Sequence, residues 1–177
     1  FSLKEALADK HNIDIDHITL GNGSNDILEM VARAFVNIQH QVIYSQHSFS
    51  VYSIVTQAVG AEHIVVPSNE WGHDLSAMLA AITNKTRLMF IANPNNPTGT
   101  WIDSECLRHL LENVPAHVIV LVDEAYFEYA SVEENYPDAS LWLNEFRNLI
   151  VTRTFSKAYG LAGLRVGYGL SHPDIAN

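Results

Sequence analysis

Lys157 is the residue whose type and surroundings first suggest chemistry. It lies in TRTFSKAYGLAGLRVGYG (152–169), among hydroxyl-bearing and small residues, and Arg165 follows eight positions later. The chain has only four lysines, and this stretch is too small and apolar to be typical of a solvated surface. Lysine amines at enzyme sites form Schiff bases with carbonyl compounds or transfer protons. The alternative is a lysine that extends into solvent from an ordinary loop.

Asp123 is a second residue with chemical potential, because it ends an apolar run. In VDEAYFEY (122–129) it follows VIVLV, which is the pattern of a buried strand. A carboxylate at such a position is costly unless a cation pairs with it. The alternative is an aspartate that caps the following turn. The position therefore predicts either a cation-binding carboxylate or a cap.

Two more loops have residue types that occur at ligand sites. GNGSND (21–26) joins a strand to a helix, and the helix start presents free N–H groups to an anion. A glycine turn capped by Ser24 or Asn25 explains the same residues equally well. ANPNNPTGT (92–100) carries two prolines that fix the backbone, so it is either a ligand loop or only a rigid turn.

Alternating strands and helices must position these loops. Strands are predicted at 17–20, 41–45, 63–67, 86–92, 117–123 and 148–153, and helices at 2–11, within 21–35, and at 49–60, 74–83 and 103–113. Strands that are continuous apolar runs are buried on both faces, which indicates a largely parallel sheet in an α/β sandwich. Ligands of such sheets bind at the carboxyl ends of the strands, where these loops begin.

Composition excludes several classes of protein. The 177 residues are 47% hydrophobic, which is enough for one globular domain, and no apolar run has the length of a membrane span. A formal net charge of −10 argues against a nucleic-acid partner. The histidines show no metal-ligand spacing, so no metal is expected. The single cysteine, Cys106, forms no internal disulfide, which fits a reducing compartment such as the cytoplasm.

Taken together and in this order, the loops resemble those of the class I and II aminotransferases, which are fold-type I enzymes that use pyridoxal 5'-phosphate. The similarity spans nearly the whole chain and is greatest to histidinol-phosphate aminotransferases, through the segments GNGSNDILEMVARAF, SFSVY, ANPNNPTGT, VDEAYFEY and TRTFSKAYGLAGLRVGYG. It implies a three-layer α/β/α sandwich with a mixed, mostly parallel sheet. It also implies that residues 1–177 form most of the large domain, and that the family's N-terminal arm and small C-terminal domain lie outside them.

The resemblance assigns roles around the cofactor ring. Lys157 corresponds to the lysine that binds the cofactor aldehyde and then moves the substrate Cα proton. Asp123 corresponds to the partner of the ring nitrogen, and Tyr126 and Asn96 correspond to the residues that contact the ring hydroxyl oxygen. Phe49 corresponds to the aromatic residue that stacks on the ring, although a core aromatic ahead of a helix remains the alternative.

The resemblance also implies a pocket for the cofactor phosphate. Its residues are Gly23, Ser24, Asn25, Thr154, Ser156 and Arg165, which offer helix-start amides, hydroxyls and a guanidinium. For Arg165, a surface ion pair is the alternative.

The implied activity is transamination of L-histidinol phosphate with 2-oxoglutarate by a cytoplasmic homodimer. Related enzymes act on aromatic amino acids or decarboxylate threonine phosphate with the same cofactor cradle, so these substrates stay open. A non-catalytic pyridoxal-phosphate-binding module is a further alternative. An NAD-binding Rossmann module is disfavoured, because GNGSND lacks the third glycine of that fingerprint.

Overall fold

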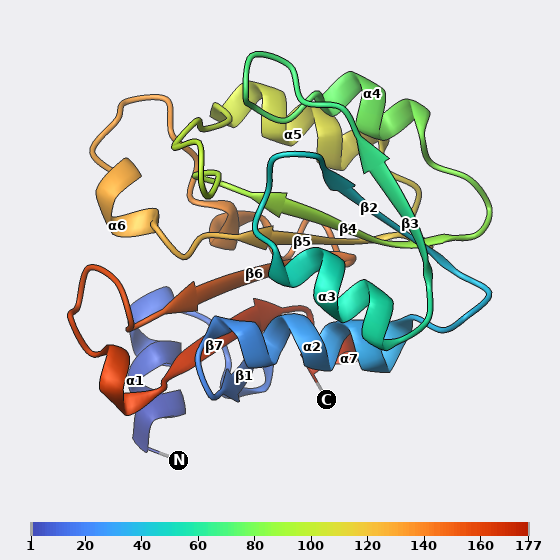
Figure 1. Cartoon of the computed structure of the whole chain (residues 1–177). Helices are drawn as coiled ribbons and strands as arrows, with labels where there is room; N and C mark the ends of the chain where they lie inside the picture. The colour runs from blue at the N-terminus through green and yellow to red at the C-terminus, as the bar shows by residue number, and fades with distance from the viewer. Residues whose placement is uncertain (1, 177) are drawn as a thin grey trace.

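The computed structural model describes residues 2–176, which fold around one seven-stranded sheet (Figure 1). The strands are β1 (Ile18–Gly21), β2 (Gln41–Ser45), β3 (Glu62–Val66), β4 (Thr86–Ala92), β5 (Ile119–Asp123), β6 (Leu149–Thr154) and β7 (Gly167–Ser171). Their order in the sheet is β1-β7-β6-β5-β4-β2-β3. Of the described strands, β7 alone runs opposite to the others, so the sheet is mixed and mostly parallel as predicted.

Helices cover both faces of the sheet, which gives the three layers. The helices are α1 (Ser2–His11), α2 (Ser24–Phe35), α3 (Val51–Ala58), α4 (Leu75–Ala80), α5 (Ser104–Asn113), α6 (Phe127–Ala130) and α7 (Pro173–Ala176). The buried residues of α2 and α3 belong to one apolar cluster, and those of α1, α4 and α5 belong to another. Figure 1 shows α2 and α3 on one side of the sheet and α4 and α5 on the other.

The central strands are buried on both faces, and their side chains alternate between the two clusters. In β5, Leu121 packs with the α2 and α3 cluster, whereas Val120 and Val122 pack with the other. Because side chains alternate along a strand, Asp123 continues the α2 and α3 face and Glu124 the opposite face. This alternation decides which side chains reach the cavity described below.

β7 is the strand that the sequence did not predict. Its segment GYGLS lacks a continuous apolar run, because Gly167 and Gly169 occupy the face toward α2. A Cβ atom at Gly167 would lie 2.3 Å from the backbone nitrogen of Ser24. Glycine is therefore required here by the close approach of α2, which is a known reason for glycine within a strand.

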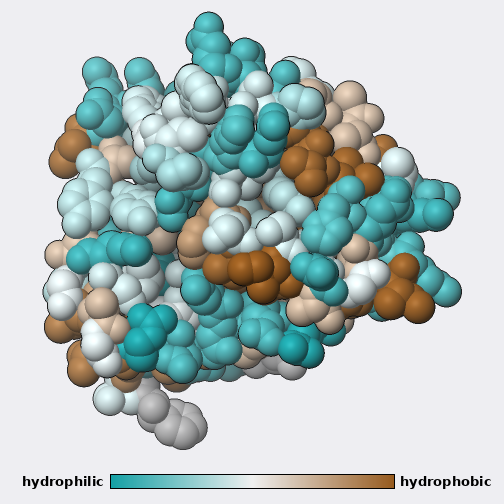
Figure 2. Space-filling model, in the orientation of Figure 1, coloured by the Kyte–Doolittle hydropathy of each residue, from teal (hydrophilic) through white to brown (hydrophobic). Residues whose placement is uncertain are grey.

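Two predicted helices are shorter than expected. α3 ends at Ala58 because Gly60, at φ 72°, turns the chain into the left-handed region. α4 begins after Asp74, whose side chain accepts a hydrogen bond from the Ala77 nitrogen and so caps the helix. It ends at Ala80, before a turn in which the Thr83 nitrogen donates to the Thr86 hydroxyl. Within residues 2–176, no helix has both the length and the apolar character needed to cross a membrane. Figure 2 shows that apolar surface on the viewed face is divided into separate patches among polar side chains.

Candidate active site

A cavity of about 210 Å³ opens at the carboxyl ends of β4, β5 and β6, next to the start of α2. Ten of the eleven predicted site residues line it: Ser24, Asn25, Phe49, Asn96, Asp123, Tyr126, Thr154, Ser156, Lys157 and Arg165. They come from segments far apart in the sequence, and the parallel strands bring them together at one edge of the sheet. Gly23 does not line the cavity, but it contributes in another way.

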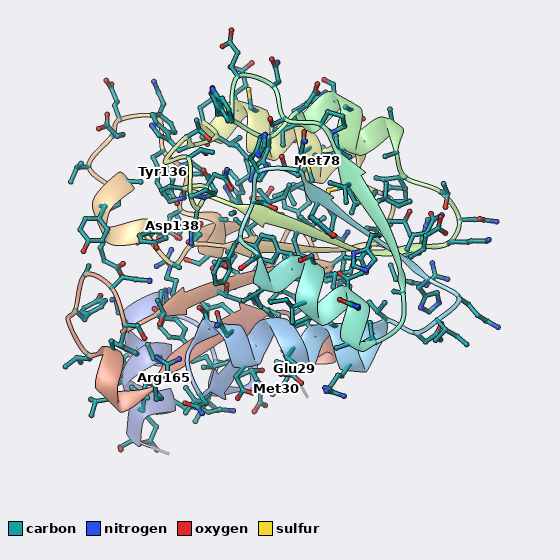
Figure 3. The ribbon with its side chains drawn as sticks, viewed as in Figure 1. Glu29, Met30, Met78, Tyr136, Asp138 and Arg165 are labelled. Carbon is teal, nitrogen blue, oxygen red and sulfur yellow. The ribbon has the colours of Figure 1, made fainter. Side chains whose placement is uncertain are left out.

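The α2 end of the cavity is built to hold an anion. Arg165 donates from Nη1 to the Ser156 hydroxyl at 3.1 Å and from Nη2 to the Asn22 carbonyl at 3.2 Å. Arg165 is labelled in Figure 3. A Cβ atom at Gly23 would lie 2.3 Å from its Nη2 atom, so only glycine leaves room for the guanidinium. The first turn of α2 adds unpaired N–H groups, which favour phosphate-like anions.

The other end of the cavity holds the carboxylate of Asp123, which is only 5% exposed. Its Oδ2 accepts a hydrogen bond from the Tyr52 hydroxyl and its Oδ1 accepts one from the Thr152 hydroxyl, both at 3.0 Å. Burial raises the pKa of Asp123, whereas the two hydrogen bonds and the charge of Lys157 act to lower it. The carboxylate is therefore preoriented, and a cationic group that reaches it would favour its ionised form.

Tyr52 and Thr152, which orient Asp123, are site residues that the sequence did not predict. Tyr52 belongs to SFSVY and is fully buried, so its position resembles an ordinary core position of α3. Its partner, Asp123, lies 71 residues away in the sequence. No local pattern connects residues at that distance, and Thr152 likewise looks like a typical strand threonine.

Lys157 lies between the two ends, with Nζ 5.3 Å from the centre of the Tyr126 ring. The expectation that this stretch is withdrawn from solvent is wrong for residues 157–165, which are exposed. They form a loop and the short helix η3 (Ala162–Leu164), and such connecting segments run over the surface.

The position of Phe49 agrees with both predicted alternatives, a residue at the cofactor site and a core aromatic residue. It lines the cavity, and it also packs against the α2 and α3 cluster. Its ring meets the edge of Tyr52 at 5.8 Å and 90°, and Tyr52 stacks on Phe90 at 4.6 Å and 6°. Such aromatic contacts fix one wall of the cavity.

The arrangement suits a ligand with an anionic group at one end and a cationic ring atom at the other. A carbonyl carbon between them would face the Lys157 amine. Within residues 2–176, no group of three or more histidine, cysteine, aspartate or glutamate side chains could hold a metal ion.

Comparison with known proteins identifies relatives of the chain. A family model described as aminotransferase class I and II matches residues 2–177. Histidinol-phosphate aminotransferase 2 of Pseudomonas fluorescens is 59% identical over all of this chain and 48% of the relative. Histidinol-phosphate aminotransferase 1 of Idiomarina loihiensis is 51% identical, with the same coverage. The chain spans about half the length of the curated relatives it matches.

Solved structures of relatives share the fold. The histidinol-phosphate aminotransferase of Sinorhizobium meliloti, in complex with pyridoxal-5'-phosphate, matches with a TM-score of 0.91 and 34% identity over 99% of this chain and 47% of that chain. L-threonine-O-3-phosphate decarboxylase from Porphyromonas gingivalis matches with a TM-score of 0.84 and 26% identity over 99% of this chain and 53% of that chain.

Proposed function

This chain belongs to the class I and II aminotransferase family, and we propose that it forms the cofactor-binding large domain of a pyridoxal 5'-phosphate-dependent histidinol-phosphate aminotransferase. The full-length enzyme would transfer the amino group of L-histidinol phosphate to 2-oxoglutarate, a step of histidine biosynthesis. The observation that carries this proposal is the convergence on one cavity of a lysine, a buried carboxylate and an anion cradle. The 59% identity to a histidinol-phosphate aminotransferase supports the choice of substrate.

The residues present fit the proposed cofactor. When bound, pyridoxal 5'-phosphate supplies a protonated ring that takes up the negative charge left when a proton leaves the substrate. Arg165, Ser156 and the first turn of α2 would hold its phosphate, because they offer a guanidinium, a hydroxyl and helix-start amides at one end of the cavity. A residue larger than glycine at position 23 would displace the Arg165 guanidinium from this phosphate site.

Asp123 would keep a proton on the ring nitrogen. Its two oxygen atoms are oriented by Tyr52 and Thr152, and its burial makes an approaching cation more favourable than it would be in water. Tyr126 and Asn96, which both line the cavity, would contact the ring hydroxyl oxygen, and Phe49 would pack against the ring.

Lys157 would bind the cofactor covalently through Nζ and move the proton at the substrate Cα atom. Its exposure suits both roles, since a substrate amine must reach the same atom. A non-catalytic binding module has little use for a carboxylate and a lysine in one cavity, so their joint presence favours an enzyme.

Steady-state kinetics of the full-length protein test the proposal. We expect the highest kcat/KM with L-histidinol phosphate, compared with L-phenylalanine and with threonine phosphate as a decarboxylation substrate. A preference for either competitor would contradict the substrate assignment. Borohydride reduction followed by mass spectrometry should find the cofactor on Lys157, and a label on Lys4, Lys10 or Lys85 would contradict the site assignment.

We also propose that the enzyme is a cytoplasmic homodimer. The loop after Lys157 exposes three large apolar side chains, those of Tyr159, Leu161 and Leu164. Exposed apolar groups beside a cavity are typical of surfaces that a partner covers. Light scattering of the full-length protein should give twice the monomer mass, and a monomer that retains full activity would contradict the dimer.

A further inference from the structure

A buried ion-pair cluster lies on the face of the sheet opposite the cavity. Arg153 is 3% exposed and donates to Oε2 of Glu124 from Nε at 2.9 Å and from Nη2 at 2.7 Å. Its Nη2 also donates to Oδ1 of Asp138 at 2.7 Å. Glu124 is fully buried, and its Oε1 accepts a hydrogen bond from the Ala139 nitrogen at 3.2 Å. All polar groups of the Glu124 side chain are therefore engaged.

The cluster lies at the point where two site-bearing strands separate. The recorded pairing of β5 with β6 ends at Asp123 and Thr152, followed by one hydrogen bond from the Glu124 nitrogen to the Thr152 carbonyl. From there β6 continues to Thr154, paired with β7. The bond from Arg153 to Glu124 ties the two strand ends together where the ladder stops.

Each member of the pair is a chain neighbour of a cavity residue. Glu124 follows Asp123, and Arg153 lies between Thr152, which holds Asp123, and Thr154, which lines the cavity. Successive side chains of a strand point to opposite faces. A shift of Arg153 or Glu124 on one face therefore moves a site residue on the other.

The cluster also reaches the segment that carries Tyr126. The guanidinium carbon of Arg153 lies 3.5 Å from the centre of the Phe127 ring, and Phe127 directly follows Tyr126. Asp138, labelled in Figure 3, caps the short helix η2 (Ala139–Trp142), which follows α6 in the chain. The Arg153 guanidinium thus contacts Glu124 and Phe127, the chain neighbours of Asp123 and Tyr126. Arg153 is itself the chain neighbour of Thr154.

Stability alone does not explain such a cluster. Taking charges out of water costs about as much as their attraction returns, so apolar side chains of similar size would stabilise the fold equally well. Burial raises the pKa of Glu124 to about 7, which illustrates that cost. A guanidinium that bonds a carboxylate through two nitrogens differs from an apolar contact in that it fixes direction as well as distance.

We propose that Arg153, through its paired bonds to Glu124, is a positioning residue that holds Asp123, Tyr126 and the Thr154–Lys157 segment in the arrangement needed for proton transfer. This inference rests on the proposed aminotransferase function. It gives residues on the face of the sheet opposite the cavity an indirect role in catalysis.

The test uses the full-length protein with bound pyridoxal 5'-phosphate and the variant Arg153→Lys, which keeps the charge but loses the paired, planar contact. Arg108→Lys is the matched control, because Arg108 also contacts two carboxylates, Glu112 and Glu145, and an aromatic ring, that of Trp142, but on the exposed surface of α5. For each protein we would measure kcat, KM, the thermal unfolding midpoint and the pH midpoint of the visible absorbance band of the cofactor.

We expect Arg153→Lys to lower kcat by about tenfold or more, because small misplacements of reacting groups have effects of that size. KM should stay within about twofold, since no residue that lines the cavity is replaced. The pH midpoint of the visible band should shift by about half a unit or more, because it reports the charges placed around the ring. Arg108→Lys should change none of these values.

A second variant separates positioning from folding. Glu124→Leu/Arg153→Met replaces the pair by apolar side chains, and Asp138, 31% exposed, remains solvated. We expect it to fold, with its unfolding midpoint lowered only by the loss of the acceptor of the buried Ala139 nitrogen, while kcat stays low. Recovery of kcat in this double variant, or a wild-type kcat and spectrum in folded Arg153→Lys, would overturn the proposal. Failure of the wild type to use histidinol phosphate would overturn only the substrate assignment, because the spectral midpoint needs no substrate.

Discussion

The hydroxyl group of Tyr52 offers the sharpest test of how the site controls the charge of Asp123. Tyr52 is fully buried, and its only side-chain hydrogen bond recorded in the described residues goes to Oδ2 of Asp123 at 3.0 Å. The variant Tyr52→Phe removes this bond and retains the stack on Phe90. It therefore changes one hydrogen-bond donor without opening a cavity.

The expected size of the effect follows from the charge of the acceptor. A hydrogen bond to an ionised group contributes about 1.5–3 kcal/mol. Burial already holds the pKa of Asp123 above its ordinary value, and the Tyr52 bond opposes that shift. Tyr52→Phe should therefore raise the pKa of Asp123 further.

The sign of the pH dependence follows from this raised pKa. The folded protein binds the Asp123 proton more tightly than the unfolded chain does, so this contribution to stability is complete below the unfolded pKa of about 4. It decreases as the pH rises from there to the folded pKa of Asp123. In Tyr52→Phe the decrease should continue to a higher pH than in the wild type, and the total loss above the folded pKa should be larger by about 1.5–3 kcal/mol.

The assay is urea unfolding of the cofactor-free full-length protein across this pH range, with cofactor affinity measured in parallel at neutral pH. Tyr44→Phe is the matched control, since Tyr44 is also a buried tyrosine but hydrogen-bonds Nδ1 of His63, at 2.7 Å, and no carboxylate. We expect weaker cofactor binding and the extended pH dependence only in Tyr52→Phe. The reasoning is refuted if the two variants lose the same free energy of unfolding at every pH and bind the cofactor equally well.

Three further changes test other parts of the site. Asp123→Ala should lower kcat by orders of magnitude, whereas Asp123→Glu should be milder because the charge survives, and near-normal turnover in Asp123→Ala would reject the ring-nitrogen role. Arg165→Lys should weaken cofactor binding by about tenfold or more in an equilibrium titration, because paired contacts to phosphate are lost; unchanged affinity would count against the phosphate assignment. Gly167→Ala should lower the free energy of unfolding in urea by about 1–3 kcal/mol or more, since its Cβ would lie 2.3 Å from the Ser24 nitrogen. The control Gly163→Ala places its Cβ in open space and should leave that free energy unchanged. Equal values for the two variants would contradict the packing argument.

The sequence predicted best those elements whose signal is local. β4 spans the predicted residues 86–92, because an uninterrupted apolar run marks a strand buried on both faces. β7 was not predicted, because its glycines are required by the close approach of α2, a helix that lies more than 130 residues earlier in the sequence. A residue chosen for the close approach of a distant element leaves no periodic signal around itself.

In the candidate site, too, the residues that could be predicted are those with a local sequence signal. Asp123 could be predicted, since a carboxylate at the end of an apolar run is conspicuous. Tyr52 could not, because its hydroxyl matters only through a partner in another strand. Arg153 and Glu124 stand beside predicted site residues in the sequence, yet only the sheet register shows that they meet on the opposite face.

The pairing of β1 with β7 has a consequence for how the protein is made. Ile18 pairs with Leu170, and the Asn22 carbonyl accepts its hydrogen bond from Arg165, so the first strand and the phosphate cradle both depend on the last described strand region. A ribosome adds roughly 5–20 residues per second, so residues 18–22 leave it roughly 7–30 s before their partners do. Such long-range pairing is slow to form, and during this interval β1 lacks its partner strand and is open to other chains. The nascent chain therefore needs protection from aggregation until about residue 171 has emerged, and cofactor loading must follow the meeting of these two distant segments.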